Sequence, residues 1–420
     1  MTFSDDKLHH FLKEQYGLEA ELSALAGELD LNYFVRSTQG HCFILKIANR
    51  NEQRENLELQ NAVINHLAGK EIGLEVSRLV KAKDGKEILQ IAEDKSTSRW
   101  VRLLTWVDGR VFAKVNPQTP ILYQRLGELC GKLCVSLSDF EHPSAHRFMK
   151  WDLSQASWIK PHLQHFAGER YDLVNYFYSL FEQRVAPVFP KLRQSVIYND
   201  ANDYNVLVSH DLTDPHVPGV IDFGDVVYTH TINELAIAIA YAIMDKPDPL
   251  ETACDVVRGF NKIFKIDEEE LRVLYSLAIT RLLISVTCSE MNRIEHPENT
   301  YLQVSSKPAW DLLTKLRAIS PELVHYAFRN ACGLEACPEH TDFTKWSTSN
   351  YKLTTFPVKN TEDLIWLDLS VGSLDMGGSQ NLMDAKHLSL PRAAVNSPAV
   401  HGLASVGRRT FAFFSAFLLV

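Results

Sequence analysis

The feature that most constrains this chain is a pair of short apolar runs that each lead into acidic residues. Residues 196–198 run into a loop that carries Asp200 and Asn205, and residues 219–221 run directly into Asp222. The β-branched and aromatic residues of these runs predict strands, and the Asn, Asp and Gly residues that follow predict tight loops. Two strands that each end in a carboxylate predict a site where oxygen ligands gather around a hard metal ion.

Composition and charge narrow the class of protein. The 420 residues are 45% hydrophobic and 23% charged, as in an ordinary globular protein, and this length predicts two or three domains. The formal net charge of -9 argues against a nucleic-acid partner. The seven cysteines lack CxxC spacing, which predicts reduced thiols in a cytoplasmic protein. Residues 1–7 show no signal peptide, and the apolar runs at 234–244 and 411–420 are too short for a bilayer, so we expect no membrane partner.

The first hundred residues predict a small sheet with flanking helices. Hydrophobic residues recur with period two in some segments and with helical spacing in others. The predicted strands cover 21–25, 33–37, 41–49, 88–92 and 100–105, and the predicted helices cover 5–16 and 52–67. The loop 26–32 contains Gly27 and Asn32, which suit a tight hairpin turn.

One lysine interrupts the apolar strand predicted over 41–49. Alternation along the strand places Lys46 on a mostly apolar face, where a charge needs a partner. Lys46 is either an ordinary surface lysine or a phosphate-binding lysine held by a glutamate of the helix 52–67. The candidates are Glu52, Glu55 and Glu58. Glu58 lies next to the inward face of that helix, and Gln60 is the alternative if the helix has another register.

Beyond residue 106 the pattern changes from strands to helices. The break at 106–110 predicts a hinge between a small sheet domain and a helical one. The predicted helices cover 122–138, 172–189, 234–244, 250–264, 268–293 and 301–319, with a further helix start at 151–153. The run 234–244 is apolar on all sides, which predicts a buried core helix. After about Gly333 the pattern signals thin out.

The acidic loops fit the chemistry of phosphoryl transfer. Asp200 can orient a hydroxyl group and accept its proton, while Asn205 and Asp222 supply oxygen ligands to Mg²⁺. The order Asp-x4-Asn, then Asp-Phe-Gly, with bracketing strands and an upstream strand lysine, is the arrangement found in protein-kinase-like enzymes. The alternative is two turn-forming clusters that cap a hairpin.

With these motifs, the chain resembles the aminoglycoside phosphotransferase family, a branch of the protein-kinase-like fold. The similarity covers roughly residues 5–330 and is greatest to the hydroxylysine kinases of that family. The segments that carry this similarity are 45–47, 102–105, 198–205, 222–225 and 233–238. The resemblance implies an α+β, two-lobed fold, with a small β-rich N-lobe over 1–106, a mainly helical C-lobe over 107–335 and a linker or truncated segment over 336–420.

The resemblance also implies roles for single residues. Asp200 is the catalytic base, and Asn205 and Asp222 bind Mg²⁺. The residues expected to contact the nucleotide are Lys46, Glu58 and the hinge residues Leu104, Thr105, Trp106 and Val107, while the partner of Lys46 stays open. The implied reaction moves the γ-phosphoryl group of ATP or GTP to a hydroxyl of an amino-containing acceptor such as hydroxylysine. Aminoglycoside or choline-type acceptors, and a catalytically silent binding module, are the alternatives.

The acceptor side of the site is predicted from charge. Asp203, Asp225 and Glu234 are acids near the catalytic motifs in sequence, and they complement a cationic amino alcohol. The alternative is that Asp203 and Asp225 cap a turn and a helix. The chain departs from the family where Tyr198 and Asn199 stand in place of the usual His-Gly, and where the loop 26–32 is poor in glycine.

The C-terminal part of the chain resembles a different group of proteins. Residues 343–390 are similar to the connecting region of bacterial proteins that fuse such a kinase domain to an aminotransferase, which predicts fusion to or association with an aminotransferase. No aminotransferase lysine motif is present, so pyridoxal phosphate is not expected. The apolar residues 411–420 are an unnatural end, a partner-binding segment or a core strand, and the sequence leaves these three open.

Overall fold

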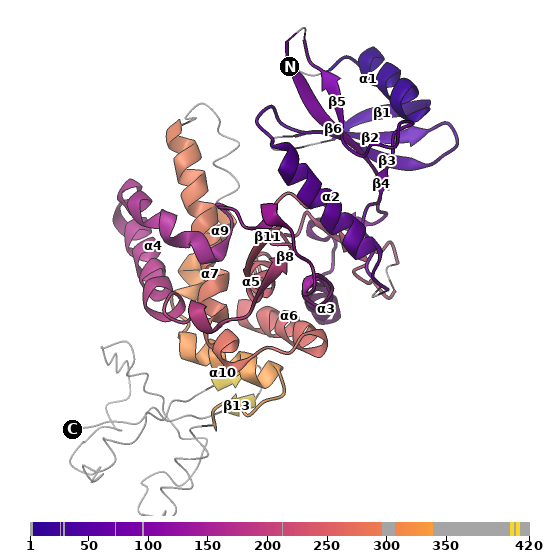
Figure 1. The fold of residues 1–420 in the computed structure, drawn as a ribbon. Helices are drawn as coiled ribbons and strands as arrows, with labels where there is room; N and C mark the ends of the chain where they lie inside the picture. Colours follow the sequence, from indigo (N-terminus) through magenta and orange to yellow (C-terminus); the bar gives the residue numbers. More distant parts are fainter. Residues whose placement is uncertain are drawn as a thin grey trace, which may run out of the picture. The chain divides into compact units, whose positions relative to one another are not determined.

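A computed structural model describes most of the chain up to residue 338. The described residues are 3–25, 27, 30–71, 73–94, 96–211, 213–295 and 307–338, with the backbone of two short strands at Ala404–Val406 and Arg409–Phe411. The chain divides into two compact units, Met1–Leu313 and Thr314–Val420. All predicted site residues belong to the first unit (Figure 1). Residues 343–390 and 412–420, on which the predictions about the tail fall, lie outside the described residues.

An antiparallel sheet forms the N-terminal region of the first unit. Its strand order is β1-β2-β3-β6-β4, with β5 also paired to β6. The strands are β1 (Ala20–Leu25), β2 (Leu31–Ser37), β3 (Cys42–Ile47), β4 (Leu79–Val80), β5 (Leu89–Ala92) and β6 (Ser98–Thr105). The five predicted strands are therefore confirmed. β4 was not predicted, because two residues are too few to show alternation.

Helices cover both faces of this sheet (Figure 1). On one face, α1 (Asp5–Phe11) and a π-helical turn (Leu12–Tyr16) bury Leu8 and Leu12 against Val35 and Leu45. Each such buried aliphatic side chain contributes about 1.5–3 kcal/mol relative to exposure. On the other face lies α2 (Arg54–Ala68), whose Leu57 packs against residues next to the strands. The period-two alternation thus places Lys46 on the α2 face of β3.

Two small ladders frame the loops that carry the acidic residues. β8 (Gln194–Ile197) pairs with β11 (Val227–His230), and β9 (Val206–Val208) pairs with β10 (Gly219–Val220) and with β7 (Arg110–Val111), all antiparallel. β8 and β10 correspond to the strands predicted from the runs 196–198 and 219–221. β11 and β7 were not predicted, because neither has enough alternation to be seen alone. Their pairing closes the two acidic loops toward each other.

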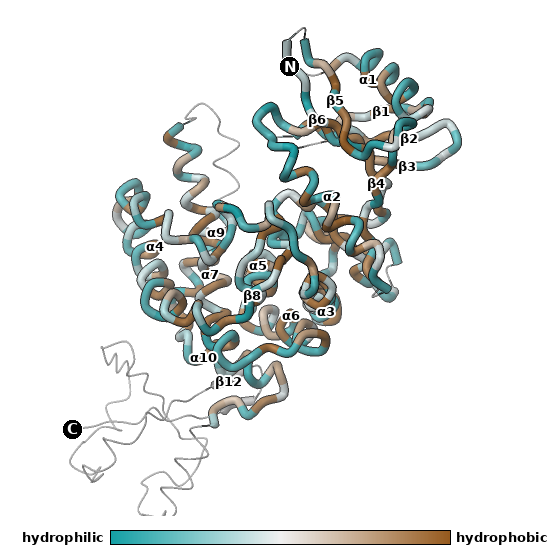
Figure 2. The backbone as a smooth tube through the Cα atoms, in the orientation of Figure 1, coloured by the Kyte–Doolittle hydropathy of each residue, from teal (hydrophilic) through white to brown (hydrophobic). Residues whose placement is uncertain are grey.

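The helical region packs around one apolar helix. α5 (Asn233–Ala242) is buried along nearly its whole length, which confirms the predicted core helix. Around it lie α3 (Pro120–Leu137), α6 (Pro249–Ile263) and α7 (Glu268–Glu295), and α4 (Gly168–Leu180) packs against α7. Hydrophobic and hydrophilic residues alternate along the outer helices (Figure 2). The apolar stretch of α7 is long enough to cross a membrane by composition alone, but 89% of it is buried inside the protein, as in a core helix.

Glycines allow α3 and α6 to approach closely. A Cβ atom added at Gly127 of α3 would lie 2.0 Å from the Val256 carbonyl oxygen, and one added at Gly259 of α6 would lie 1.8 Å from the Gln124 carbonyl oxygen. The two helix backbones are therefore in direct contact, which only glycine permits at these two positions.

Several predicted boundaries differ from the structure. The helix predicted over 172–189 begins earlier, at Gly168, and ends in a π-helical turn (Phe181–Val185), because Pro187 and Pro190 cannot continue it. The helix start predicted at 151–153 is a 3-10 segment (Leu153–His165) that Asp152 caps through the Ser154 amide. Of the helix predicted over 301–319, the structure describes α9 (Lys307–Leu316). α10 (Pro321–Ala331) was not predicted.

Candidate active site

A short loop holds Asp200 and Asn205 together. The side-chain oxygen of Asn202 accepts hydrogen bonds from the backbone amides of Tyr204 and Asn205, at 2.8 and 3.0 Å, and so closes a tight turn. The turn brings Nδ2 of Asn205 to 2.6 Å from Oδ2 of Asp200. Asn202, which is not part of the Asp-x4-Asn motif, therefore forms the turn that brings Asp200 and Asn205 together.

Side chains next to the loop support it from below, namely those of Tyr198 and Glu234. Asn199 has a φ of 67°, in the left-handed region that Gly and Asn tolerate best, which explains why Asn can stand where the family has Gly. The carboxylate of Glu234 accepts the Asn199 amide at 2.9 Å. The hydroxyl of Tyr198 donates to the Ile221 carbonyl oxygen at 2.5 Å, which ties this loop to the loop of Asp222. Tyr198 and Asn199, which depart from the family pattern, thus still hold the loop in place.

Asp222, in the second acidic loop, forms an ion pair with Lys46 of β3. Nζ of Lys46 lies 3.0 Å from Oδ2 of Asp222, and Oδ1 of Asp222 accepts the Gly224 amide at 3.2 Å. Asp222 has a φ of 64°, in the left-handed region, which non-glycine residues rarely adopt. Burial alone would raise the pKa of Asp222, but the charge and the hydrogen bond of Lys46 hold it below its usual range. Asp222 is therefore ionised at neutral pH, as a metal ligand must be.

Arg281 is the main site residue that sequence reasoning missed. It projects from α7, is 2% exposed, and donates from Nη2 to Oδ1 of Asp200 at 2.8 Å. The same guanidinium also donates to the Tyr241 hydroxyl at 3.2 Å and to the Trp151 carbonyl oxygen at 3.1 Å. Its signal was an arginine in an otherwise apolar stretch of the helix predicted over 268–293, since a buried charge requires a partner.

The environment of Asp200 favours its protonated form. Burial, together with the nearby carboxylates of Asp225 and Asp222, raises the pKa of Asp200 to about 7, against the lowering effect of Arg281. A carboxyl group with a pKa near neutrality is matched to accepting and releasing a proton at physiological pH. The geometry therefore suits a general base that two hydrogen bonds orient.

The predicted hinge residues lie at the end of β6 and just after it. Leu104 and Val107 are buried, and the hydroxyl of Thr105 accepts the Arg78 amide at 2.8 Å. Trp106 is 39% exposed, and its ring contacts the ring of Phe34 edge-on at 4.9 Å between centroids. The assignment of these residues to nucleotide binding stays a prediction.

Glu58, the favoured candidate partner of Lys46, does not pair with it in this structure. Glu58 lies on the solvent side of α2 and accepts a hydrogen bond from Arg54, one helical turn earlier, at 2.9 Å. The partner of Lys46 is Asp222. Gln60 occupies the inward position of the helix, but it binds Arg102 instead of Lys46. The rotation of α2, which apolar packing sets, decides which side chain faces the sheet.

Glu234 is placed differently from its predicted role at the acceptor. It is fully buried under the loop of Asp200, where it binds backbone amides, so it does not reach an acceptor molecule. Asp203 and Asp225 are both half-buried beside the catalytic loops. Burial raises the pKa of Asp203, and the nearby Lys246 opposes this effect. Only Asp203 and Asp225 remain as candidates for contact with a cationic acceptor.

The donor set fits a magnesium ion bound together with phosphates. Asn205 uses its Nδ2 toward Asp200, which turns its oxygen away from that carboxylate, and Asp222 presents an ionised carboxylate. Mg²⁺ in phosphate-transferring sites is held by one or two such oxygen groups and by the substrate phosphates. Within the described part of the chain, no cluster of three or more His, Cys, Asp or Glu side chains has the geometry of an all-protein metal site.

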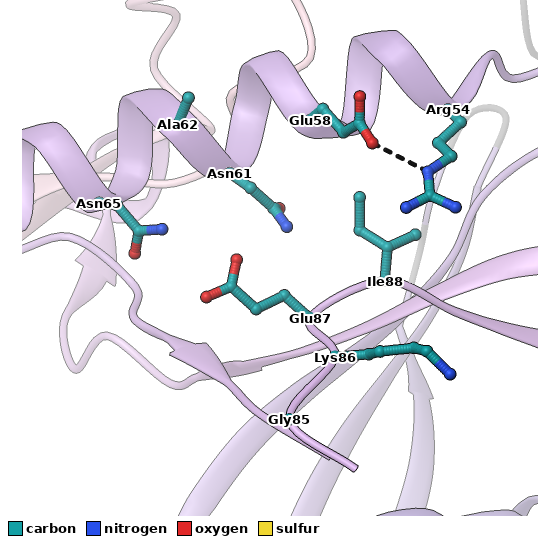
Figure 3. A pocket seen from close by; sticks show the side chains of 9 residues that line it. All are labelled: Arg54, Glu58, Asn61, Ala62, Asn65, Gly85, Lys86, Glu87 and Ile88. Atoms are coloured by element: carbon teal, nitrogen blue, oxygen red, sulfur yellow. Dashed lines mark hydrogen bonds and ion pairs between the residues drawn. The ribbon is translucent and has the colours of Figure 1, made fainter.

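A separate cavity of about 420 Å³ lies between α2 and the turn before β5 (Figure 3). Figure 3 shows the side chains of α2 on one wall and those of the turn before β5 on the other. The lining residues are Arg54, Glu58, Asn61, Ala62, Asn65, Gly85, Lys86, Glu87 and Ile88. None of the residues that surround Asp200 or Asp222 lines it, so it is distinct from the candidate active site.

Known proteins resemble this chain over most of its described length. Hydroxylysine kinase of Danio rerio is 28% identical over 330 residues, which is 75% of this chain and 92% of the relative. Hydroxylysine kinase of Mus musculus is 27% identical over 292 residues, which is 65% of this chain and 76% of the relative.

Solved structures share the fold. A microcompartment-associated aminopropanol kinase aligns with a TM-score of 0.61 at 18% identity, over 75% of this chain and 98% of that one. An amicoumacin kinase in complex with AMP-PNP and Ca²⁺ aligns with a TM-score of 0.56 at 16% identity, over 74% and 94% of the two chains. These likenesses confirm the predicted kinase-like fold with a β-sheet region and a helical region.

A family description matches the chain across both regions. The model of the phosphotransferase enzyme family aligns with residues 21–265. This range contains the sheet with Lys46 and both acidic loops, which are the parts that converge in the candidate active site. The chain therefore belongs to the phosphotransferase enzyme family.

Proposed function

We propose that this chain is a small-molecule kinase that transfers the γ-phosphoryl group of ATP or GTP to a hydroxyl group of an amino-containing acceptor, with hydroxylysine or a similar amino alcohol as the best candidate. The observation that carries the proposal is the oriented carboxylate of Asp200. Arg281 and Asn205 hold its two oxygens at 2.8 and 2.6 Å, beside the ion pair of Lys46 and Asp222.

In this proposal each group of the chain has one role. Asp200 orients the acceptor hydroxyl and accepts its proton. Lys46 binds the nucleotide phosphates, and Asn205 and Asp222 hold Mg²⁺, which when bound neutralises charge on the phosphates. Because phosphoryl transfer needs little covalent assistance, the rate comes from holding the hydroxyl in line and from these fixed charges.

The acceptor class rests on similarity and charge. The vertebrate relatives are hydroxylysine kinases, and one fold neighbour is an aminopropanol kinase. The half-buried acids Asp203 and Asp225 lie beside the catalytic loop and complement an ammonium group. An amino alcohol satisfies both the hydroxyl that Asp200 requires and this acidic surrounding.

A transfer screen tests the proposal. The purified chain is incubated with Mg²⁺ and either ATP or GTP, and with hydroxylysine, 1-amino-2-propanol, ethanolamine, choline or an aminoglycoside. Phosphorylated product is measured by mass spectrometry. We expect product with hydroxylysine or 1-amino-2-propanol. Binding of the nucleotide without any product would support the silent binding module instead.

Two predictions about context rest on the sequence alone. Association with an aminotransferase stays a prediction from residues 343–390, and co-purification with such an enzyme from the native source tests it. The cytoplasmic location stays a prediction from the scattered cysteines.

A further inference from the structure

A second buried cation lies beside Lys46. β3 and β6 pair so that Lys46 is directly opposite Arg102, and the two side chains lie on the same face of the sheet, toward α2. Directly opposite residues of an antiparallel pair have Cβ atoms about 4.5–5.5 Å apart. Arg102 is 3% exposed, so its guanidinium is removed from solvent next to the lysine that faces Asp222.

The hydrogen-bond partners of Arg102 carry no charge. Its Nη2 donates to Oε1 of Gln60 at 2.6 Å, and its Nη1 donates to Oδ1 of Asn61 at 2.8 Å. Both carboxamides belong to α2 and are themselves buried. Among the described residues, no carboxylate accepts a hydrogen bond from this guanidinium.

The acids nearest to Arg102 already have other partners. Burial lowers the pKa of Arg102 to about 10, and the fields of Asp222, Asp30 and Glu52 only partly oppose this effect. Asp222 is paired with Lys46, Asp30 accepts the Asn49 amide at 2.9 Å, and Glu52 accepts the Asn56 side chain at 2.8 Å. A buried cation without a bonded counter-ion costs stability in the free protein.

We propose that Arg102 is a second fixed positive charge for the phosphates of the donor nucleotide, held ready by neutral carboxamides so that the phosphates themselves serve as its counter-ion. The inference rests on the proposed function, since it requires that a nucleotide binds beside Lys46. A glutamate at the position of Gln60 would stabilise the free protein but would cancel the charge that attracts the triphosphate. The neutral pair Gln60 and Asn61 avoids this cancellation while it still fixes the guanidinium.

Two substitutions on α2 test the inference by adding a counter-ion. Gln60→Glu and Asn61→Asp each place a carboxylate where the guanidinium now meets an amide oxygen. We expect the midpoint of thermal unfolding without ligand to rise by roughly 2–4 °C. We expect the affinity for Mg-ATP or Mg-GTP, measured by calorimetry, to fall by about tenfold. The affinity for adenosine or guanosine, which lack phosphates, stays unchanged.

Matched variants separate charge from structure. Asn65→Asp adds the same charge one turn further along α2, at an exposed position, and it should leave triphosphate and nucleoside affinity as in the wild type. Arg102→Met removes the cation and should weaken only triphosphate binding. Arg102→Lys keeps the charge and should restore part of that affinity. A merely structural Arg102 would instead weaken triphosphate and nucleoside binding alike.

The outcomes distinguish this inference from the proposed function. A wild-type chain that binds neither Mg-ATP nor Mg-GTP would overturn the proposed function and the inference with it. A wild-type chain that binds a triphosphate, with Gln60→Glu, Asn61→Asp and Arg102→Met binding it equally well, would overturn the inference alone. Lower triphosphate affinity in all three variants, with unchanged nucleoside affinity, would support it.

Discussion

At the scale of single residues, the site depends on side chains that hold other side chains. Asp200 is oriented by Arg281, which lies 81 positions later in the chain, and by Asn205 within its own loop. Glu234 acts on Asp200 indirectly, because it accepts a hydrogen bond from the backbone amide of Asn199, the residue before Asp200. The position of the Asp200 carboxylate is thus set by side chains from its own loop and from distant helices.

Replacement of Asp200 tests its role as the general base. Asp200→Asn keeps the size of the side chain and one acceptor oxygen, but its amide group cannot accept the proton. We expect kcat to fall by about 10²–10⁴-fold with little change in nucleotide affinity. Steady-state kinetics and calorimetry measure the two quantities. The exposed Asp108→Asn serves as the control, and full turnover by Asp200→Asn would remove Asp200 from the mechanism.

The buried carboxyl of Glu234 predicts a pH dependence of stability. Burial raises the pKa of Glu234 from 4.5 to about 7, so between these pH values the folded state binds a proton that the unfolded state does not. The contribution of Glu234 to stability is therefore largest at low pH and decreases as the pH rises toward 7.

The comparison with Glu234→Gln isolates this contribution. The wild type should lose stability relative to the variant by up to about 3 kcal/mol between pH 4.5 and pH 7. Denaturant unfolding at several pH values measures the difference. A difference that is independent of pH would show that Glu234 is ionised throughout this range.

At the scale of elements, the helical region depends on backbone contact between α3 and α6. Gly127 and Gly259 leave no room for a methyl group, because the opposing carbonyl oxygens lie 2.0 and 1.8 Å from the position of an added Cβ. These helices pack beside α5, whose residue Glu234 supports the catalytic loop. Close packing of two outer helices thus helps to position the site.

The substitution Gly127→Ala tests the contact between the two helices. The added methyl group must push α3 and α6 apart, so we expect a loss of about 1–3 kcal/mol in the free energy of unfolding, despite the better helix propensity of alanine. Gly69→Ala is the matched control, since the nearest atom to its added Cβ lies 3.4 Å away. Equal stability of the two variants would contradict the close approach.

At the scale of the whole molecule, Lys46 and Asp222 join the sheet region to the acidic loops within the first unit. The ion pair spans 176 positions of sequence. A nucleotide that binds beside it contacts both regions and should stabilise the folded state by mass action. This effect reaches about 2.7 kcal/mol at a ligand concentration of 100 times Kd.

Thermal unfolding with and without Mg-nucleotide tests this connection. The wild type should melt at a higher temperature with Mg-ATP or Mg-GTP, and EDTA should reduce the shift. Asp222→Ala should lose the magnesium-dependent part, because its carboxylate is the proposed metal ligand. An unchanged magnesium-dependent shift in Asp222→Ala would exclude Asp222 as that ligand.

Local signals in the sequence were enough for part of the site. The alternation around Lys46, the strand ends before Asp200 and Asp222, and the spacing to Asn205 all act over a few residues, so the sequence predicted the catalytic loops and the sheet. The family resemblance extended this to the two-region fold, which the fold neighbours confirm.

Tertiary structure decided the partners. Whether Glu58 or Gln60 faces the sheet depends on the rotation of α2 about its axis, and apolar packing sets this rotation from outside the helix. Arg281 reaches Asp200, and Glu234 reaches the loop beneath it, only after distant elements pack together. The sequence by itself determined which residues can carry the chemistry, because composition and spacing are local. The fold alone determined which charges meet, because burial and pairing arise between segments far apart in the chain.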